Sequence, residues 1–325
     1  MVENGLGFNR ELWGLPTDRG PAPGPRGCFW TENEDVVRLL DSLSREAPIL
    51  LAGPTASGKS ALALALAARD GRVIVNADAL QVFACWRILT ARPSIDDEAA
   101  LPHALYGHVG RDQAYSVGHW LREVAGLLDR PVVIVGGTGL YFAALTEGLA
   151  EIPAVPADVR AEAEALQAAG GVQALLAGLD AATATRIDTD NPRRVQRAWE
   201  VLRATGRGLA DWQADTGSPL LPLHTAEAVV LRPDPAWLDA RIARRFGQML
   251  ALGALEEVRA MQPVWQPDRP WARAIGAADL MAHLQGEVDL QSASAAAILS
   301  SRRYAKRQRT WGRSRRSGWL GVALA

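Results

Sequence analysis

Cysteine is scarce in this sequence: Cys28 and Cys85 are the only two among 325 residues. Their separation matches no metal-ligand spacing, so neither a zinc site nor a disulfide framework is expected. Such cysteine usage is typical of a protein that works in a reducing cytosol. Lysine is also rare, because Lys59 and Lys306 are the only lysines among 35 basic residues. Where a lysine occurs, it is therefore not the default cation of this chain.

Long apolar runs and targeting segments are missing as well. No window approaches 18 uninterrupted apolar residues, which excludes a membrane-spanning helix. The N-terminus, MVENGLGFNRELWG, has an early acid and lacks the apolar core of a signal peptide. With 48% hydrophobic and 22% charged residues, the composition is that of a soluble enzyme with a substantial core. We expect a cytoplasmic monomer.

The net charge of −1 argues against indiscriminate binding to nucleic acid, but the charge is unevenly distributed. The segment 290–325 contains no acidic residue. Its basic residues are Arg302, Arg303, Lys306, Arg307, Arg309, Arg313, Arg315 and Arg316. Such a run is either a solvated helix face or a contact for a phosphate backbone, and composition alone does not separate the two.

The chain begins its regular structure with a β/α rhythm. Short apolar runs at 49–53, 72–78 and 131–137 predict buried parallel strands, and 227–233 returns to strand character. Strong helix formers fill 59–70 between the first two runs. This alternation predicts a parallel sheet with helices on its faces.

The rhythm changes at 156–214, where the sequence is rich in Ala, Leu and Arg and predicts only helices. The fold class expected is therefore α/β: a P-loop NTPase-like domain with a mostly parallel sheet, plus an all-helical insertion domain. We place the P-loop domain at 47–145 and 222–325 and the insertion at 146–221. Residues 1–46, with the turn-rich GPAPGPRG, are expected to be a flexible N-terminal extension that the enzyme does not need, with one short amphipathic helix from Glu34 to Ala47.

One motif stands out between the first strand and the first helix. The segment 53–60, GPTASGKS, fits the pattern G-x4-G-K-[ST] in the structural context that the pattern requires. Its glycines allow backbone N–H groups to converge on an anion, at the positive end of a helix dipole. The residues expected to bind a diphosphate are Gly53, Pro54, Thr55, Ala56, Ser57, Gly58, Lys59 and Ser60. Lys59 would supply a point charge, and Ser60 a hydroxyl group for Mg²⁺.

A P-loop indicates a bound diphosphate but not a reaction. A kinase or ATPase needs an acid at a strand end to help hold magnesium, whereas the run 131–135 continues into Gly136, Gly137 and Thr138. The second strand does end in an acid, Asp78. Since ligands of open parallel sheets bind beyond the carboxyl ends of strands, Lys59, Asp78 and Thr138 should converge. From the residues alone, Asp78 fits a helix cap or a turn equally well.

Six blocks in a fixed order resemble the signatures of the tRNA dimethylallyltransferase (isopentenyltransferase) family, in its bacterial form. They are GPTASGKS at 53–60, NADALQVF at 76–83, TARP at 90–93, VGGTGLYFAAL at 135–145, NPRRVQRAWEV at 191–201 and YAKRQRTW at 304–311. The resemblance runs from about Pro48 to Trp311. It implies an enzyme that transfers a dimethylallyl group from dimethylallyl diphosphate to N6 of an adenosine beside the anticodon, assisted by Mg²⁺.

The resemblance also implies roles for single residues. The P-loop would bind the prenyl diphosphate, Asp78 would be the general base, and Arg245 would lie near the diphosphate beside Lys59. The positions implied to contact the tRNA anticodon stem-loop are Asp78, Ala79, Leu80, Gln81, Thr138, Arg160, Arg193, Arg194, Val195, Gln196, Arg197 and Arg273. Without the resemblance, the arginines near 193 fit a solvated helix face.

The sequence departs from the family pattern at two segments. His103 to Gly107 lack a second histidine and an acid, and Gly276 to Asp279 lack an aromatic residue and a base. These segments keep a second function open, that of a non-catalytic RNA-binding protein with the same fold. The P-loop itself leaves a nucleoside or small-molecule kinase open, which would turn over ATP instead of a prenyl diphosphate.

Overall fold

The computed structural model describes residues 34–316 and 318–324, and the remaining residues lie outside this description. The chain divides into two compact units. We call the first the sheet unit, which comprises the described residues within 34–111, 128–137 and 227–324. The second, the helical unit, comprises Asp112–Leu127 and Thr138–Ala226. It contains the whole predicted insertion at 146–221 and, in addition, two helices on its N-terminal side.

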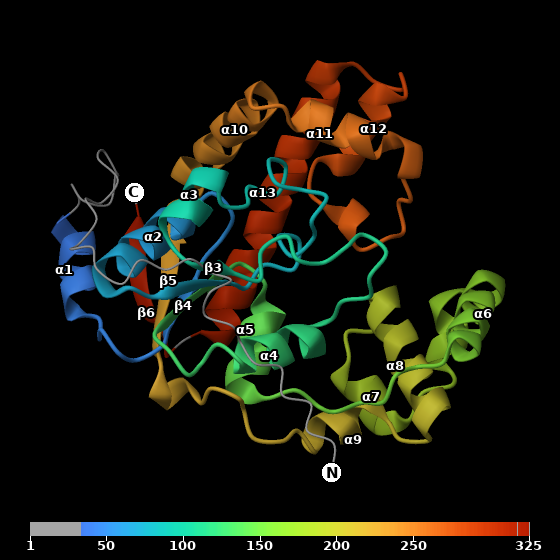
Figure 1. The fold of residues 1–325 in the computed structure, drawn as a ribbon. Coiled ribbons are helices and arrows are strands. Elements are labelled where there is room, and N and C mark those ends of the chain that lie inside the picture. Colours follow the sequence, from blue (N-terminus) through green and yellow to red (C-terminus); the bar gives the residue numbers. More distant parts are fainter. Residues whose placement is uncertain (1–33, 317, 325) are drawn as a thin grey trace, which may run out of the picture. The chain divides into compact units, whose positions relative to one another are not determined.

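The sheet unit is built on six strands in the order β3-β2-β4-β1-β5-β6, and each neighbouring pair is parallel (Figure 1). The strands are β1 (Ile49–Ala52), β2 (Val73–Asn76), β3 (His103–Ala104), β4 (Val132–Gly136), β5 (Glu227–Pro233) and β6 (Leu320–Leu324). The four predicted strands are confirmed as β1, β2, β4 and β5. The strands β3 and β6, at the two edges, were not predicted from the sequence.

The centre of the sheet is apolar because its strands are covered on both faces. Every residue of β1 and of β4 is buried, as the continuous apolar runs predict for parallel strands. In register, Ile49 pairs with Val133 of β4 and with Glu227 of β5. The strand β1 thus lies inside the sheet, between β4 and β5. The P-loop follows the carboxyl end of β1 and therefore lies near the centre of that edge of the sheet.

Seven α-helices complete the described part of the sheet unit (Figure 1). They are α1 (Glu34–Ser42), α2 (Lys59–Asp70), α3 (Ile95–Ala100), α10 (Pro235–Ala251), α11 (Ala254–Met261), α12 (Ala277–Leu284) and α13 (Leu290–Arg315). The basic segment near the C-terminus is thus the last half of α13, a single helix of 26 residues. None of the described helices combines the length and the apolar composition that crossing a bilayer requires.

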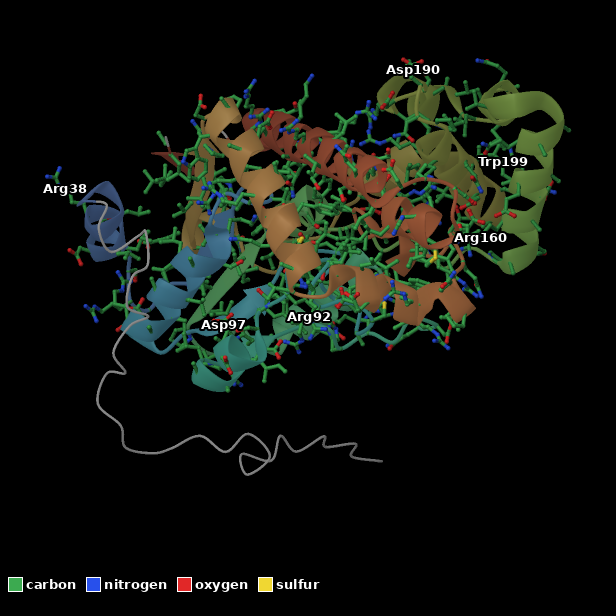
Figure 2. All side chains as sticks on the ribbon, turned by 90° about the horizontal axis from the view of Figure 1, so that it is seen from above. Arg38, Arg92, Asp97, Arg160, Asp190 and Trp199 are labelled. Carbon is green, nitrogen blue, oxygen red and sulfur yellow. The ribbon has the colours of Figure 1, made fainter. Side chains whose placement is uncertain are left out.

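The helical unit contains no strand among its described residues. Its helices are α4 (Val117–Ala125), α5 (Gly139–Glu147), α6 (Ala157–Leu176), α7 (Ala181–Arg186), α8 (Pro192–Thr205) and α9 (Leu209–Ala214). As predicted, α8 begins with Asn191 as its cap, whose side chain accepts the N–H of Arg194, and with Pro192 at its first position. Trp199 of α8, labelled in Figure 2, packs with Ala163 and Leu175 in the core.

The described part of the N-terminal extension is packed on the sheet unit, which corrects the expectation of a flexible segment up to 46. Leu39 and Leu43 are each 7% exposed and belong to the main core, with Leu62 and Leu66 of α2. The buried Arg72 donates to the carbonyl oxygens of Ser44 and Ala47. The extension thus contributes a helix and backbone acceptors to the fold, and residues 1–33 lie outside the described range.

A chain that begins at Glu46 is therefore expected to be less stable than one that begins at Glu34. Removing a buried leucine typically costs about 2–5 kcal/mol, and this truncation removes Leu39 and Leu43 together with an acceptor of Arg72. Thermal unfolding of the two proteins measures the difference. Equal melting temperatures would show that α1 does not contribute to the core.

Candidate active site

The P-loop, Gly53–Ser60, curls between β1 and α2 at the carboxyl edge of the sheet. Gly58, the cap of α2, has a φ of 92°, a left-handed conformation that glycine adopts without strain. Lys59 begins the helix, and its Nζ donates to the carbonyl oxygen of Pro54 at 2.8 Å. Lys59 thus bonds back to its own loop, and the loop lies at the N-terminus of α2, a position that favours negative charge.

Neighbouring helices hold the loop at Thr55 and Ala56. Arg245 of α10 donates to the Thr55 hydroxyl at 3.2 Å, and Arg241, one turn earlier, donates to the Ala56 carbonyl oxygen at 3.0 Å. From α13, the Oε1 of Gln308 accepts the N–H of Thr55 at 2.8 Å. The loop is therefore fixed by both α10 and α13.

Asp78 follows β2 in a tight turn. Its Oδ1 accepts the N–H of Leu80 at 2.9 Å, and its own N–H donates to the side chain of Asn76 at 2.8 Å. The Asn76 amide also donates to the carbonyl oxygen of Leu105, which ties the turn to the segment beside β3. Asp78 thus does act as a turn residue, yet its carboxylate also lines the pocket beside the P-loop.

A pocket of about 480 Å³ lies at this edge of the sheet. Its cationic residues are Lys59, Arg241, Arg244 and Arg245, and Asp78 is the one acid among its lining residues. Burial lowers the pKa of Lys59 from 10.5 to about 7; Asp78 opposes this shift, while Arg245 and Arg316 add to it. Burial also lowers the pKa of Arg245. This excess of desolvated positive charge suits a multiply charged anion such as diphosphate.

A smaller cavity of about 60 Å³ shares Thr55, Asp78 and Arg245 with the pocket. Its apolar lining residues are Ala56, Leu80, Leu89, Ile242, Phe246, Met249 and Ile275. An anion held by the P-loop would therefore have an apolar recess next to it, with the Asp78 carboxylate at the junction.

The other predicted residues of the sheet unit lie nearby with different contacts. Leu80 lines the apolar cavity, and Gln81 lines the larger pocket, where its amide donates to the carbonyl oxygens of Thr90 and Ala91. The Gln81 amide thus holds the TARP segment in place. Ala79 is partly buried in the same turn, and Arg273 is exposed at the end of a short 3-10 helix, where it donates to the carbonyl oxygen of Asp268.

In the helical unit, the predicted arginines lie on the surface. Arg160, labelled in Figure 2, is exposed on α6, and Arg193, Arg194 and Arg197 are exposed on α8. The side chain of Val195, unlike those of the three arginines on α8, is completely buried in the core of this unit. Gln196 donates to Glu200 on the same helix. Thr138 is the N-cap residue of α5, at the start of the second segment of this unit.

Several residues of the pocket were not predicted from the sequence. Arg241 lies one helical turn before Arg245, and Arg244 comes directly before Arg245. The spacing of RIARR could therefore have placed these cations on one side of α10. Tyr106 belongs to the segment that departs from the family pattern, yet it lines the pocket. Gln308 lies in the quoted block at 304–311, and no sequence rule assigns its contact with the P-loop.

The fold and the pocket define a class of protein: a P-loop-like α/β protein with a cationic pocket at the carboxyl edge of its sheet. Comparison with known proteins specifies the family, because the model of the IPP transferase family matches residues 81–315. The chain belongs to this family, that of the tRNA dimethylallyltransferases, and is a prenyltransferase.

Relatives cover nearly the whole chain. The tRNA dimethylallyltransferase of Cereibacter sphaeroides strain KD131 is 62% identical over 314 residues, which are 95% of this chain and 100% of the relative. That of Dinoroseobacter shibae is 61% identical over 287 residues, 87% of this chain and 97% of the relative. The crystal structure of the full-length tRNA isopentenylpyrophosphate transferase from Bacillus halodurans is 29% identical, with a TM-score of 0.60, and the match covers 86% of this chain and 90% of that one.

Proposed function

We propose that the protein transfers the dimethylallyl group of dimethylallyl diphosphate to N6 of an adenosine adjacent to the anticodon of tRNA. The observation that carries this proposal is the junction of two cavities at Thr55, Asp78 and Arg245. The cationic pocket suits the diphosphate of the donor, and the aliphatic and aromatic side chains on one part of the smaller cavity, such as Leu89 and Phe246, offer apolar surface to its five-carbon chain. A kinase would need no apolar recess at this point, and the relatives do not favour that alternative.

In the proposed reaction, the bond between the allylic carbon and the diphosphate oxygen breaks, and a bond from N6 to that carbon forms. Negative charge grows on the leaving diphosphate, where Lys59, Arg245 and the P-loop N–H groups stabilise it. The proton of the alkylated N6 passes to the Asp78 carboxylate. The acceptor base has to leave the stacked anticodon loop to reach this junction.

Magnesium fits the donor set of the pocket only together with the substrate. Ser60 and Asp78 line the pocket and offer the oxygen ligands that Mg²⁺ prefers. Within the described part of the chain, no group of three or more His, Cys, Asp or Glu residues could hold a metal by itself. When bound, the ion would supply further positive charge to the diphosphate oxygens, with the Ser60 hydroxyl as its protein ligand.

Incubation with unmodified tRNA and labelled dimethylallyl diphosphate, followed by nucleoside analysis, tests the proposed function directly. The expected product is N6-dimethylallyl adenosine at the position beside the anticodon. A parallel incubation with ATP labelled in its terminal phosphate tests the kinase alternative. Phosphoryl transfer to a nucleoside without any prenyl transfer would contradict the proposal.

We further propose that the exposed arginines of α8 bind the tRNA backbone. Replacing Arg193, Arg194 and Arg197 with Gln should weaken tRNA binding and leave the affinity for the prenyl donor unchanged. The slope of log K against log salt concentration should fall by about 0.7 to 0.9 for each phosphate that the variant no longer binds.

A matched control removes three exposed arginines of the sheet unit, Arg45, Arg130 and Arg259, which are 72%, 40% and 52% exposed. The control lowers the net charge by the same amount as the α8 variant. If the arginines of α8 themselves contact the tRNA, the control should keep the wild-type slope of log K against log salt concentration. An identical slope in the α8 variant and the wild type would mean that α8 presents only a solvated face.

A further inference from the structure

The side chain of Gln308 joins the P-loop to the end of β4. From α13, its Oε1 accepts the N–H of Thr55 at 2.8 Å, and its Nε2 donates to the carbonyl oxygen of Gly137 at 3.1 Å. Thr55 and Gly137 are more than 80 positions apart in the sequence but follow neighbouring parallel strands. One side chain thus fixes the distance between two turns at the carboxyl edge of the sheet.

The chemistry of the amide matches both of its neighbours. The Thr55 N–H requires an acceptor, and the Gly137 carbonyl requires a donor, so the two hydrogen bonds together determine which way the amide faces. A glutamate could accept from Thr55 but would place a second oxygen against the Gly137 carbonyl. A leucine or methionine could fill the space but would leave both backbone groups without these bonds.

The position of Gln308 also explains why residue 137 is a glycine. A Cβ on Gly137 would lie 2.0 Å from the Gln308 Nε2, while the next atom outside that side chain, the carbonyl oxygen of Gly53, is 3.4 Å away. The φ of Gly137 is outside the left-handed region, so its backbone does not itself require glycine. An alanine at this position would therefore have to displace the end of the Gln308 side chain and break its hydrogen bonds to the two turns.

We propose that Gln308 is a positioning residue for the diphosphate site, which it serves by holding the P-loop in its binding conformation. Gln308 acts on the site through Thr55. The Thr55 N–H donates a hydrogen bond to Gln308, and the Thr55 hydroxyl accepts one from Arg245. Thr55 lines both the cationic pocket and the apolar cavity. Loss of the Gln308 amide therefore releases the loop where the donor's diphosphate meets its prenyl chain.

Calorimetric titration of the full chain with inorganic diphosphate tests this inference, which rests on the proposed function. Gln308→Ala should bind diphosphate about 5- to 30-fold more weakly, as expected for the loss of two hydrogen bonds. Gln308→Glu, which keeps the size and one acceptor, should also bind more weakly. Gln291→Ala, at an exposed position of the same helix, should match the wild type. The affinity of all variants for unmodified tRNA should stay within a few-fold.

A double-mutant cycle tests the interaction between Gln308 and Gly137. Gly137→Ala should lower the melting temperature and the diphosphate affinity, because the new methyl group collides with the amide. Gly137→Ala combined with Gln308→Ala should behave like Gln308→Ala alone, since the collision is removed. Additive losses in the double variant would overturn the explanation for Gly137.

The failure of this inference differs from that of the proposed function. Wild-type affinity for diphosphate in both Gln308 variants would show that the residue has only a structural role, whatever the protein catalyses. Diphosphate binding by the wild type without prenyl transfer to tRNA would instead contradict the proposed reaction, and a loss of affinity in the Gln308 variants would still support the positioning role.

Discussion

Asparagine in place of Asp78 is expected to slow single-turnover prenyl transfer by about 10² to 10⁴, the usual contribution of a general base. The exocyclic amine is a poor acid, so Asp78 need not ionise it before the attack. Its task is to accept the proton as the nitrogen becomes cationic, and its negative charge also favours the positive charge that develops on the nitrogen and the allyl group. The measurement is the rate of a single turnover with tRNA and donor at saturation.

The substitution keeps the local structure. The Asp78 Oδ1 accepts the N–H of Leu80, and the asparagine oxygen can accept the same hydrogen bond, so the turn after β2 is retained. The lost charge has a second consequence, because Asp78 raises the pKa of Lys59. Without it, that pKa falls further below its usual range, and the donor site loses positive charge at neutral pH. The comparison should therefore be made near pH 6, where Lys59 stays protonated more fully.

Asp96→Asn is the matched control, since Asp96 is an exposed aspartate on α3, outside both cavities. It should react at the wild-type rate. Dissociation constants of the Asp78 variant for tRNA and donor should lie within a few-fold of the wild type. A single-turnover rate within about threefold of the wild type would mean that Asp78 only positions the loop and that the base lies elsewhere.

The central strands could be predicted from the sequence because burial on both faces leaves continuous apolar runs, as in β1 and β4. The edge strands left no comparable pattern. β3 has only two residues, and β6, Leu320–Leu324, has mostly exposed side chains and follows directly on a basic helix. Leu39 and Leu43 were also missed, since a short amphipathic helix after a turn-rich segment does not reveal what it packs on.

The part of the site that depends on short sequence motifs could be predicted. The P-loop spacing and the acid at the end of β2 placed Lys59 and Asp78 at one edge of a parallel sheet, and the structure brings them into one pocket. The bridge from Gln308 to the P-loop could not be predicted, because it depends on how α13 returns to the sheet. The burial of Val195 could not be predicted either, because it lies in a basic motif while its side chain faces the core of the helical unit.

Replacing Lys59 with Met is expected to weaken the binding of dimethylallyl diphosphate about 10- to 150-fold, as for the loss of a hydrogen bond to a charged group. Transfer should slow as well, since Lys59 is placed where charge grows on the leaving diphosphate. Binding of tRNA should stay near that of the wild type. Calorimetry with donor and with unmodified tRNA measures both affinities, and an unchanged donor affinity would exclude Lys59 from the diphosphate site.

The same substitution should make the ligand-free protein more stable, in a pH-dependent way. The pKa of Lys59 is about 7 in the folded protein, compared with 10.5 ordinarily, so between these values the unfolded chain binds the additional proton. Through Lys59, the free energy of unfolding therefore increases as the pH rises from about 7 to 10.5. Lys59 is least favourable for stability below pH 7, because the folded protein then has to hold a charge that is removed from water. The melting temperature of Lys59→Met should exceed that of the wild type most at about pH 6, and the difference should shrink by about pH 9.5.

The affinity of the wild type for the donor should fall as the pH rises, whereas the contribution of Lys59 to stability increases. Diphosphate binds the protonated ammonium group, so wild-type affinity should decline as the pH rises above about 7, because binding then has to draw a proton from solution. Lys59→Met has no ammonium group to titrate and should lack this decline. Donor affinity at about pH 6 and pH 9, measured for both proteins, separates this effect from the titration of the diphosphate itself, which is common to both. Parallel pH profiles would mean that the charge on Lys59 does not contact the bound diphosphate.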